Sequence, residues 1–204
     1  PPIIPYVEKI KQTVGAKSVI LYAPTHRGEG RRTFDLISTL DIVNTDKILT
    51  ANNAILLIKM HHYHQDHNPD VSLDNTLSRI IWLRKEDIPE INPLLNYTDI
   101  LITDYSGVYF DYLMLDRPII LTPFDLEQYL AGDREMYDDY GNIATAGPMC
   151  KNWNEVMAEC QKVLEGNDQY REERKAAQKK FNTFVDAKSC SRVIEVAKNM
   201  VGIQ

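Results

Sequence analysis

Several features that would point to a partner or a compartment are absent from this 204-residue sequence. No apolar run approaches the roughly 20 residues that a membrane-spanning helix needs. The chain has no basic run or tail and its formal net charge is -6. This argues against nucleic acid as a main partner, because phosphate backbones attract clustered cations. The three cysteines, Cys150, Cys160 and Cys190, have the spacing of neither a metal site nor a disulfide framework, so a reducing compartment is expected.

Common nucleotide-binding and hydrolase motifs are absent as well. The sequence has no Walker loop and no Gly-x-Gly-x-x-Gly, so neither a P-loop nor a conventional dinucleotide site is indicated. Ser106 lacks the Gly-x-Ser-x-Gly context of a hydrolase nucleophile. Low glycine content, with no internal repeat and no low-complexity tract, favours a single compact unit over residues 1–204.

Short apolar runs alternate with helical patterns along the chain. This alternation predicts an α/β domain with a parallel sheet, crossover helices and closing helices at the C-terminus. The expected strands are 18–22, 54–59, 79–82, 100–102 and 119–121. The expected helices are 6–16, 34–50, 88–97, a segment from 108 that Arg117-Pro118 ends, 125–130, 153–164, 168–182 and 187–200. The last of these is expected to face inward with Val193, Ile194, Ala197 and Val201.

Residues 100–122 read as strand, turn, helix and strand, and they carry the strongest functional signal. Asp104, Ser106 and Gly107 lie where the strand ends and the helix begins. Ligands of parallel sheets collect at the carboxyl ends of strands, and anions bind at the helix N-termini that follow. The alternative is local: Asp and Ser cap helices, and Gly relaxes a turn.

Two other loops follow predicted strands and carry cations. Residues 25–32 include Arg27, Arg31 and Arg32, and residues 59–67 include Lys59 and four histidines. Both loops are expected to converge with Ser106 on one phosphate-bearing ligand, because arginine forks match phosphate oxygens. The alternative is that they are ordinary solvated loops.

The histidines raise the question of a metal. His62, His64 and His67 with Asp66 offer nitrogen and oxygen ligands for zinc, but their spacing matches no established metal motif. No metal site is therefore predicted. A histidine that donates to a transferring phosphate is the preferred interpretation.

Six segments, in order, resemble the CDP-glycerol glycerophosphotransferases, which are the teichoic-acid primases and polymerases. Residues 21–27 (Leu-Tyr-Ala-Pro-Thr-His-Arg) resemble Tyr-Ala-Pro-Thr-Trp-Arg, and Lys59-Met-His61 is similar to the start of Lys-Leu-His-Pro. Residues 101–108 (Leu-Ile-Thr-Asp-Tyr-Ser-Gly-Val) resemble Ile-Thr-Asp-Tyr-Ser-Ser-Val. Residues 110–118, 134–148 and 180–192 resemble three further motifs of the family. The resemblance covers nearly the whole chain.

The resemblance implies a fold and an activity. The family has the two-domain GT-B architecture, and this chain is similar to its C-terminal, Rossmann-like half. Residues 1–204 are thus expected to be one nucleotide-donor-binding domain of a longer transferase. Such enzymes transfer glycerol phosphate from CDP-glycerol to a hydroxyl of a lipid-linked teichoic-acid or capsule-type polymer and release CMP. No cofactor is implied, the missing N-terminal half would bind the acceptor, and the location would be cytoplasmic, at the inner face of the membrane.

The resemblance also implies roles for individual residues. The positions that match the catalytic ones are His61, Asp104 and Ser106. The expected donor-binding residues are Thr25, Arg27, Lys59, Tyr105, Gly107, Arg134, Ser191 and Arg192. Three departures from the family pattern are present: Gly107 replaces a serine, His62 replaces a proline, and Gly147-Pro148 reverses a Pro-Gly pair.

Three other functions remain open at this stage. A GT-B glycosyltransferase that uses a nucleotide sugar would share the fold. A non-catalytic α/β binding domain would carry the same residues without turnover. A metal-dependent hydrolase would need the histidine cluster to retain a metal.

Overall fold

Five apolar segments pair into a single parallel sheet, in the order β3-β2-β1-β4-β5. The computed structural model describes residues 3–27, 37–60, 79–84, 86–132 and 136–202. The strands are β1 (Ser18–Tyr22), β2 (Ala54–Ile58), β3 (Ile80–Trp82), β4 (Ile100–Thr103) and β5 (Ile119–Leu121). The predicted α/β class with a parallel sheet is confirmed, and each strand lies within a residue of its predicted bounds.

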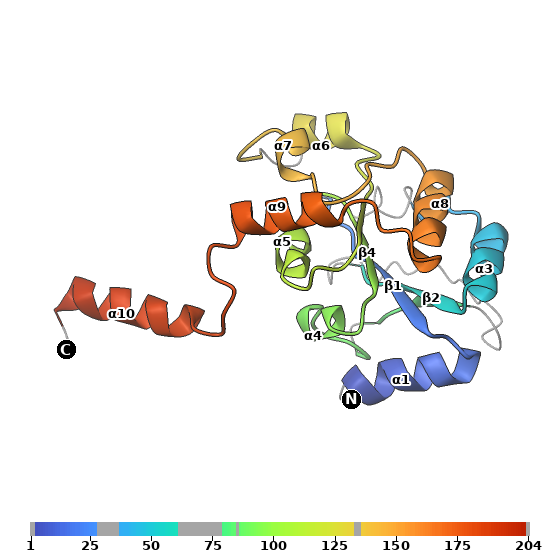
Figure 1. The fold of residues 1–204 in the computed structure, drawn as a ribbon, viewed down its shortest axis with the longest axis horizontal. Coiled ribbons are helices and arrows are strands. Elements are labelled where there is room, and N and C mark those ends of the chain that lie inside the picture. Colours follow the sequence, from blue (N-terminus) through green and yellow to red (C-terminus); the bar gives the residue numbers. More distant parts are fainter. Residues whose placement is uncertain (1–2, 28–36, 61–78, 85, 133–135, 203–204) are drawn as a thin grey trace.

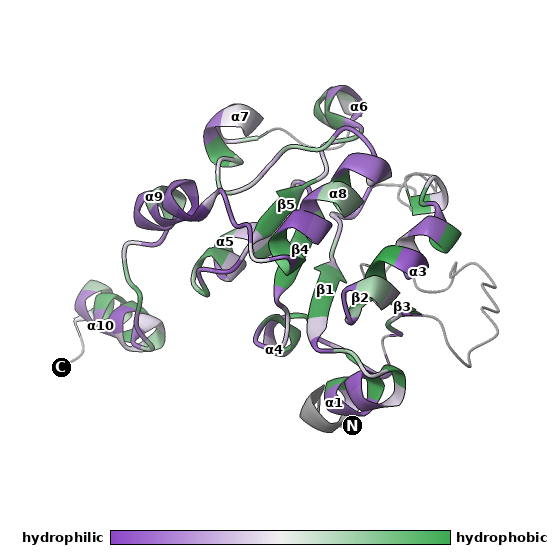
Figure 2. Cartoon of the chain, turned by 45° about the vertical axis from the view of Figure 1, so that its right-hand side comes forward, coloured by the Kyte–Doolittle hydropathy of each residue, from purple (hydrophilic) through white to green (hydrophobic). Residues whose placement is uncertain are grey.

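The strands are apolar throughout because both faces of the sheet are covered. In β1, Val19 and Leu21 belong to one hydrophobic core, whereas Ile20 and Tyr22 belong to the other. Figure 2 shows the hydrophobic strands enclosed by helices of mixed character. One face packs against α1 (Ile3–Val14), α4 (Asn92–Leu95), α5 (Val108–Leu113) and α9 (Arg171–Phe181), and the other against α3 (Ile42–Ala51) and α8 (Trp153–Leu164). The result is a three-layer α/β/α domain.

Two short helices follow β5 in the chain. They are α6 (Leu126–Gly132) and α7 (Tyr140–Ile143), and both lie near the carboxyl edge of the sheet (Figure 1). The chain then returns to the sheet at Gly147, where an added Cβ would lie 1.9 Å from the Ile119 carbonyl oxygen. Only glycine allows this approach. The next residue can then pair with β5, where the Pro148 carbonyl oxygen accepts a hydrogen bond from the Leu121 amide at 2.9 Å.

Two predicted helices are shorter than the sequence pattern suggests. The predicted helix 34–50 is interrupted at residues 39–41, and α3 starts at Ile42 because the Asp41 carboxylate caps it by accepting from the Asn44 amide at 2.9 Å. The predicted helix 88–97 shortens to α4, which has Pro93 in its first turn. Proline suits that position but not a helix interior.

The last helix is where the prediction of inward-facing side chains is wrong. Helix α10 (Ser189–Val201) extends away from the sheet (Figure 1). Val193 is 67% exposed and Ile194 57% exposed, and Ala197 and Val201 are exposed as well. The apolar periodicity is real, but it gives no information about which surface covers it. The helices that do close the described domain are α8 and α9.

Candidate functional site

The carboxyl ends of β1 and β4 flank the point where the strand order reverses. From β1 the chain proceeds through β2 to β3 on one side, and then returns to β4 on the other. At this point the Ala23 amide donates to Ile102 O at 2.9 Å, and the Thr103 hydroxyl donates to Ala23 O at 2.8 Å. Ligands of open α/β sheets bind at such switch points. The topology therefore directs attention to the loops after β1 and β4.

A cavity of about 390 Å³ lies at this switch point. Its walls come from the loops after β1 and β2, from the segment that leads into α4, and from the turn and first residues of α5. They are Ala23, Pro24, Lys59, Met60, Pro89, Ile91, Asn92, Ser106, Gly107, Val108 and Asp111. The volume falls within the range typical of small-molecule sites, and a mainly apolar lining with a few polar groups is the usual composition of such sites.

The polar groups of the cavity include the Lys59 ammonium, which can pair with an anion, and the Asp111 carboxylate, which can accept from a ligand hydroxyl. Lys59, whose residue is 7% exposed, is the one cation among the described lining residues. Ser106 Oγ accepts a long hydrogen bond from the Val108 amide at 3.4 Å. Since the hydroxyl is the acceptor in this bond, it can still donate its own proton to a ligand. An added Cβ on Gly107 would have no neighbour within 4 Å, so the surface is open there.

Beside the cavity, Arg27 forms a buried ion-pair network with two aspartates. Its side chain is 1% exposed. Nε and Nη2 donate to the two carboxylate oxygens of Asp125, at 2.9 and 2.8 Å, and Nη1 lies 2.7 Å from Asp104 Oδ2. Burial alone would lower the pKa of Arg27, but the hydrogen bonds and charges of Asp125 and Asp104 raise it, so the guanidinium stays charged.

Asp104 links the loops after β1 and β4. Its Oδ1 accepts from the Thr25 amide at 2.8 Å, from the Thr25 hydroxyl at 2.6 Å and from the Tyr105 amide at 2.6 Å. Only 2% of this residue is exposed. The carboxylate is therefore engaged with protein groups on both of its oxygens.

Aromatic rings surround the same network. The Tyr105 ring stacks on Tyr129 of α6 with centroids 4.1 Å apart, and it meets the edge of Tyr140 at 5.2 Å. Tyr105 Oη donates to Asp125 Oδ1 at 3.1 Å. Burial and the nearby Asp125 charge raise the pKa of Tyr105 above its usual range, so the hydroxyl keeps its proton.

The predicted site residues therefore separate into three groups. Lys59, Ser106 and Gly107 line the cavity. Thr25, Arg27, Asp104 and Tyr105 form the network beside it and are absent from its lining. Ser191 and Arg192 belong to α10, away from the cavity, and Arg192 instead pairs with Asp186 at 2.9 Å.

Other predicted residues fall outside the described part of the chain. These are His61 and Arg134, together with Arg31, Arg32, His62, His64, His67 and Asp66. Their roles stay predictions. Among the described residues no group of three or more histidine, cysteine or acidic side chains has the arrangement of a metal site.

Three residues of this region escaped the sequence analysis. Asp125 was counted only as the start of a short helix, because an aspartate there is an ordinary capping residue. Asn92 and Asp111 line the cavity, but each lies within a helical pattern that carries no chemical signal. Asp111 does fall inside the resembling segment 110–118, and that was the one available indication.

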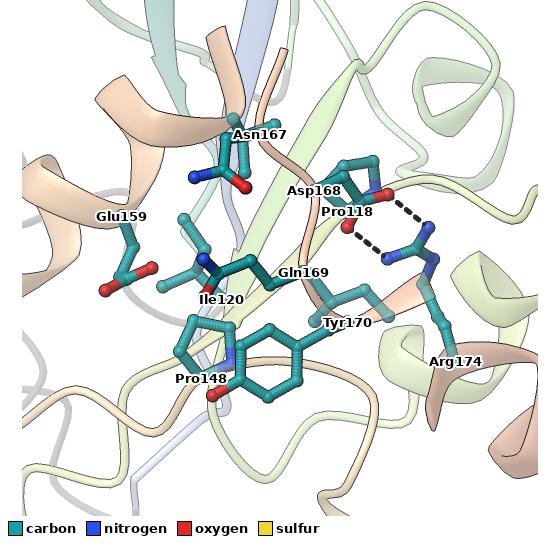
Figure 3. Close-up of a pocket in the computed structure, with 11 residues that line it drawn as sticks. Pro118, Ile120, Pro148, Glu159, Asn167, Asp168, Gln169, Tyr170 and Arg174 are labelled. Atoms are coloured by element: carbon teal, nitrogen blue, oxygen red, sulfur yellow. Dashed lines mark hydrogen bonds and ion pairs between the residues drawn. The ribbon is translucent and has the colours of Figure 1, made fainter. Parts of the chain in front are cut away.

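A second cavity, between the α8–α9 connection and β5, is too small for a substrate. Its volume is about 10 Å³, about enough for a single water molecule. Figure 3 shows the Arg174 guanidinium turned toward Asp168, to which it donates at 2.7 and 3.0 Å. This site is a structural ion pair.

Among the described residues, no helix has the length and apolar character needed to cross a membrane.

A sequence profile of the family described as CDP-Glycerol:Poly(glycerophosphate) glycerophosphotransferase matches residues 7–198. This chain belongs to that family. Among curated members, it is 36% identical to a teichoic acid poly(glycerol phosphate) polymerase of Bacillus subtilis (strain 168), over 69% of this chain and 18% of that protein. It is 30% identical to the teichoic acid ribitol-phosphate polymerase TarL of Staphylococcus aureus (strain NCTC 8325 / PS 47), over 74% of this chain and 27% of TarL.

The fold agrees with that of a solved family member. The wall teichoic acid polymerase TagF matches with a TM-score of 0.69 and 27% identity, over 95% of this chain and 46% of that chain. A TagF variant soaked with CDPG matches with a TM-score of 0.68 and 26% identity, over 95% of this chain and 45% of that chain. The chain thus spans less than half of the solved TagF chain. The predicted GT-B-type Rossmann-like fold and membership of a transferase family are confirmed.

Proposed function

We propose that this glycerophosphotransferase-family chain is the donor-binding domain of a transferase that uses CDP-glycerol. The cavity at the switch point of the sheet carries the proposal, because it places Lys59 and Ser106 together in a space large enough for a nucleotide. In a longer, two-domain protein, the remaining half would supply the acceptor site.

The proposed reaction balances without a redox partner or cofactor. A hydroxyl oxygen of the acceptor polymer attacks the phosphorus that carries glycerol, and a new phosphodiester bond forms. The bond between that phosphorus and the oxygen that links it to CMP breaks, CMP leaves, and the hydroxyl proton passes to a base. Reactions of this type depend mainly on positioning and on neutralising phosphate charge.

Two of the cavity residues have a direct role in this proposal. The Lys59 ammonium offsets pyrophosphate charge, and the Ser106 hydroxyl donates to a phosphate oxygen. His61, Asp104 and Ser106 remain the predicted catalytic positions. In the described geometry Asp104 acts by holding Thr25 and the Tyr105 amide in place, because both of its oxygens are engaged with the protein.

The acceptor and the location belong to the same proposal. We expect a lipid-linked teichoic-acid or capsule-type polymer as acceptor, with the full protein in the cytoplasm at the inner face of the cell membrane. The TagF variant soaked with CDPG supports the choice of donor. The family description and the teichoic-acid relatives support the choice of polymer.

Calorimetric titration with CDP-glycerol, CMP and a UDP-hexose tests the choice of donor. Saturable binding of both cytidine ligands, with little or none of the UDP-hexose, is the expected result. Preference for the UDP-hexose would instead indicate a nucleotide-sugar glycosyltransferase. Ser106→Ala and Lys59→Met should each weaken the binding of CDP-glycerol. Loss of the Lys59 charge should lower the affinity by about tenfold. Unchanged affinity in both variants would exclude this cavity as the donor site.

A further inference from the structure

Asp125 lies outside the cavity, yet it connects three of the loops at the carboxyl edge of the sheet. It follows β5 and precedes α6, and only 7% of it is exposed. Its two oxygens accept from Arg27 Nη2 and Nε, and Oδ1 also accepts from Tyr105 Oη. One carboxylate from the β5 loop thus binds the β1 loop and the β4 loop at once.

The contacts continue from Asp125 to two walls of the cavity. Arg27 is held against Asp104, and Asp104 in turn accepts from the amides of Thr25 and Tyr105. Thr25 directly follows Pro24, and Tyr105 directly precedes Ser106. Pro24 and Ser106 are lining residues of the cavity and belong to two different loops. A change at Asp125 therefore reaches both loops through buried hydrogen bonds and through the Arg27–Asp104 ion pair.

The charges explain why Asp125 cannot be replaced by a neutral group without effect. Arg27 is 1% exposed and lies between two carboxylates. An asparagine at position 125 would offer a donor where Arg27 also donates, and it would remove one of the two negative charges. Asp104 would then be the one carboxylate left beside Arg27, and the bond that ties Arg27 to the β5 loop would be weakened.

We propose that Asp125 is a positioning residue that sets the spacing between the β1 loop and the Ser106–Gly107 turn across the donor cavity. Asp125 is absent from the lining of the cavity. Its effect on the donor passes through Arg27, Tyr105 and Asp104. This inference rests on the proposed function for its ligand, but the arrangement of the loops can be measured without ligand.

The chain contains a matched control for a buried arginine pair. Arg174 is 1% exposed and is held by the carboxylate of Asp168 at 2.7 and 3.0 Å. Figure 3 shows this pair beside the small cavity. Neither residue lines the donor cavity. Asp125→Asn and Asp168→Asn therefore make the same chemical change beside a buried arginine, although the Asp168 side chain is 29% exposed and that of Asp125 4%. Only Asp125 lies next to the proposed site.

The experiment compares these two variants of the 204-residue chain by amide NMR and by titration with CDP-glycerol. For Asp125→Asn we expect changed amide shifts at Thr25, Ser106 and Gly107 and a loss of affinity of about tenfold or more. For Asp168→Asn those amides should keep their positions, and affinity should stay within about twofold of the original chain. Unchanged Ser106 and Gly107 amides in Asp125→Asn, or equal losses of affinity in both variants, would overturn the proposal.

A milder pair of variants covers the case in which Asp125→Asn does not fold. Tyr105→Phe removes only the hydroxyl that donates to Asp125, and Tyr112→Phe removes a buried hydroxyl that donates to Thr98 O at 2.9 Å. The proposal expects shifted Ser106 and Gly107 amides in the first variant and not in the second. The same amides unchanged in Tyr105→Phe would contradict it.

The two proposals fail in distinguishable ways. If the unmodified chain does not bind CDP-glycerol, the proposed function fails, while the amide shifts still decide whether Asp125 positions the loops. If the unmodified chain binds and the Asp125 variant binds equally well with unmoved amides, only the positioning role fails.

Discussion

Arg27 and Asp125 are 98 residues apart in the sequence, and their side chains form a two-bond ion pair in the interior, at 2.9 and 2.8 Å. This pair joins the loop after the central strand to the loop after an edge strand of the sheet. The position of the cavity walls therefore depends on a contact between loops that β1, β4 and β5 bring together.

Arg27→Lys should destabilise the chain although it conserves charge. One ammonium cannot bond to both Asp125 oxygens and still reach Asp104, so a buried carboxylate loses its partner. We expect the free energy of unfolding to fall by about 3 kcal/mol in urea titrations. Arg84→Lys, at an exposed pair with Asp87, should cause no measurable change. Equal losses of stability in Arg27→Lys and Arg84→Lys would contradict the burial of the Arg27 ion pair.

Gly107→Ser should be tolerated and should restore the hydroxyl that the family pattern has at this position. Gly107 has a φ of -57°, which any residue adopts, and an added Cβ would meet nothing within 4 Å. We expect unchanged stability and CDP-glycerol affinity equal to or higher than that of the original chain, measured by calorimetry. A loss of affinity would show that the ligand needs the open surface at this position.

Gly147→Ala should be strongly destabilising. Its Cβ would lie 1.9 Å from the Ile119 carbonyl oxygen, so the segment beside β5 would have to move. A loss of about 2 kcal/mol or more is expected in urea unfolding. Gly132→Ala is the control, because its Cβ would have no neighbour within 4 Å. A neutral Gly147→Ala would mean that this segment does not pack on β5 as described.

The cysteines provide a test of where α10 lies. Cys150 and Cys160 are buried, and burial raises the pKa of the Cys150 thiol to about 12, so little thiolate forms near neutral pH. Cys190 is exposed on α10. A thiol reagent at pH 8 should therefore label the native chain once, rapidly, and Cys190→Ser should abolish that fast phase. A protected Cys190 would show that α10 is covered in solution.

The fold was largely predictable from local sequence patterns. Buried parallel strands such as 54–58 are uninterrupted apolar runs, and Pro118 and Pro123 mark the two ends of the strand at 119–121. The errors have physical causes. Asp41 divides a helix because a capping side chain can end one segment and begin another. The prediction that Ile194 faces inward is wrong, because amphipathic periodicity does not reveal whether another element covers the apolar face.

The candidate site was predictable only in part. Ser106 and Lys59 follow strands, so topology alone brought them to the same edge of the sheet. Arg27 was expected to touch the donor, because a loop arginine suggests phosphate, but two aspartates bury it. Asp125 could not be found from the sequence, since nothing local distinguishes a helix-capping aspartate from one that pairs with a residue far away in the chain.

Amide NMR of the unmodified chain during titration with CDP-glycerol tests the central claim most directly. The account predicts saturable shifts centred on Lys59, Asn92, Ser106 and Gly107, at the carboxyl ends of the strands. Shifts confined to the region between α8 and α9 or to α10, with those four residues unmoved, would contradict it.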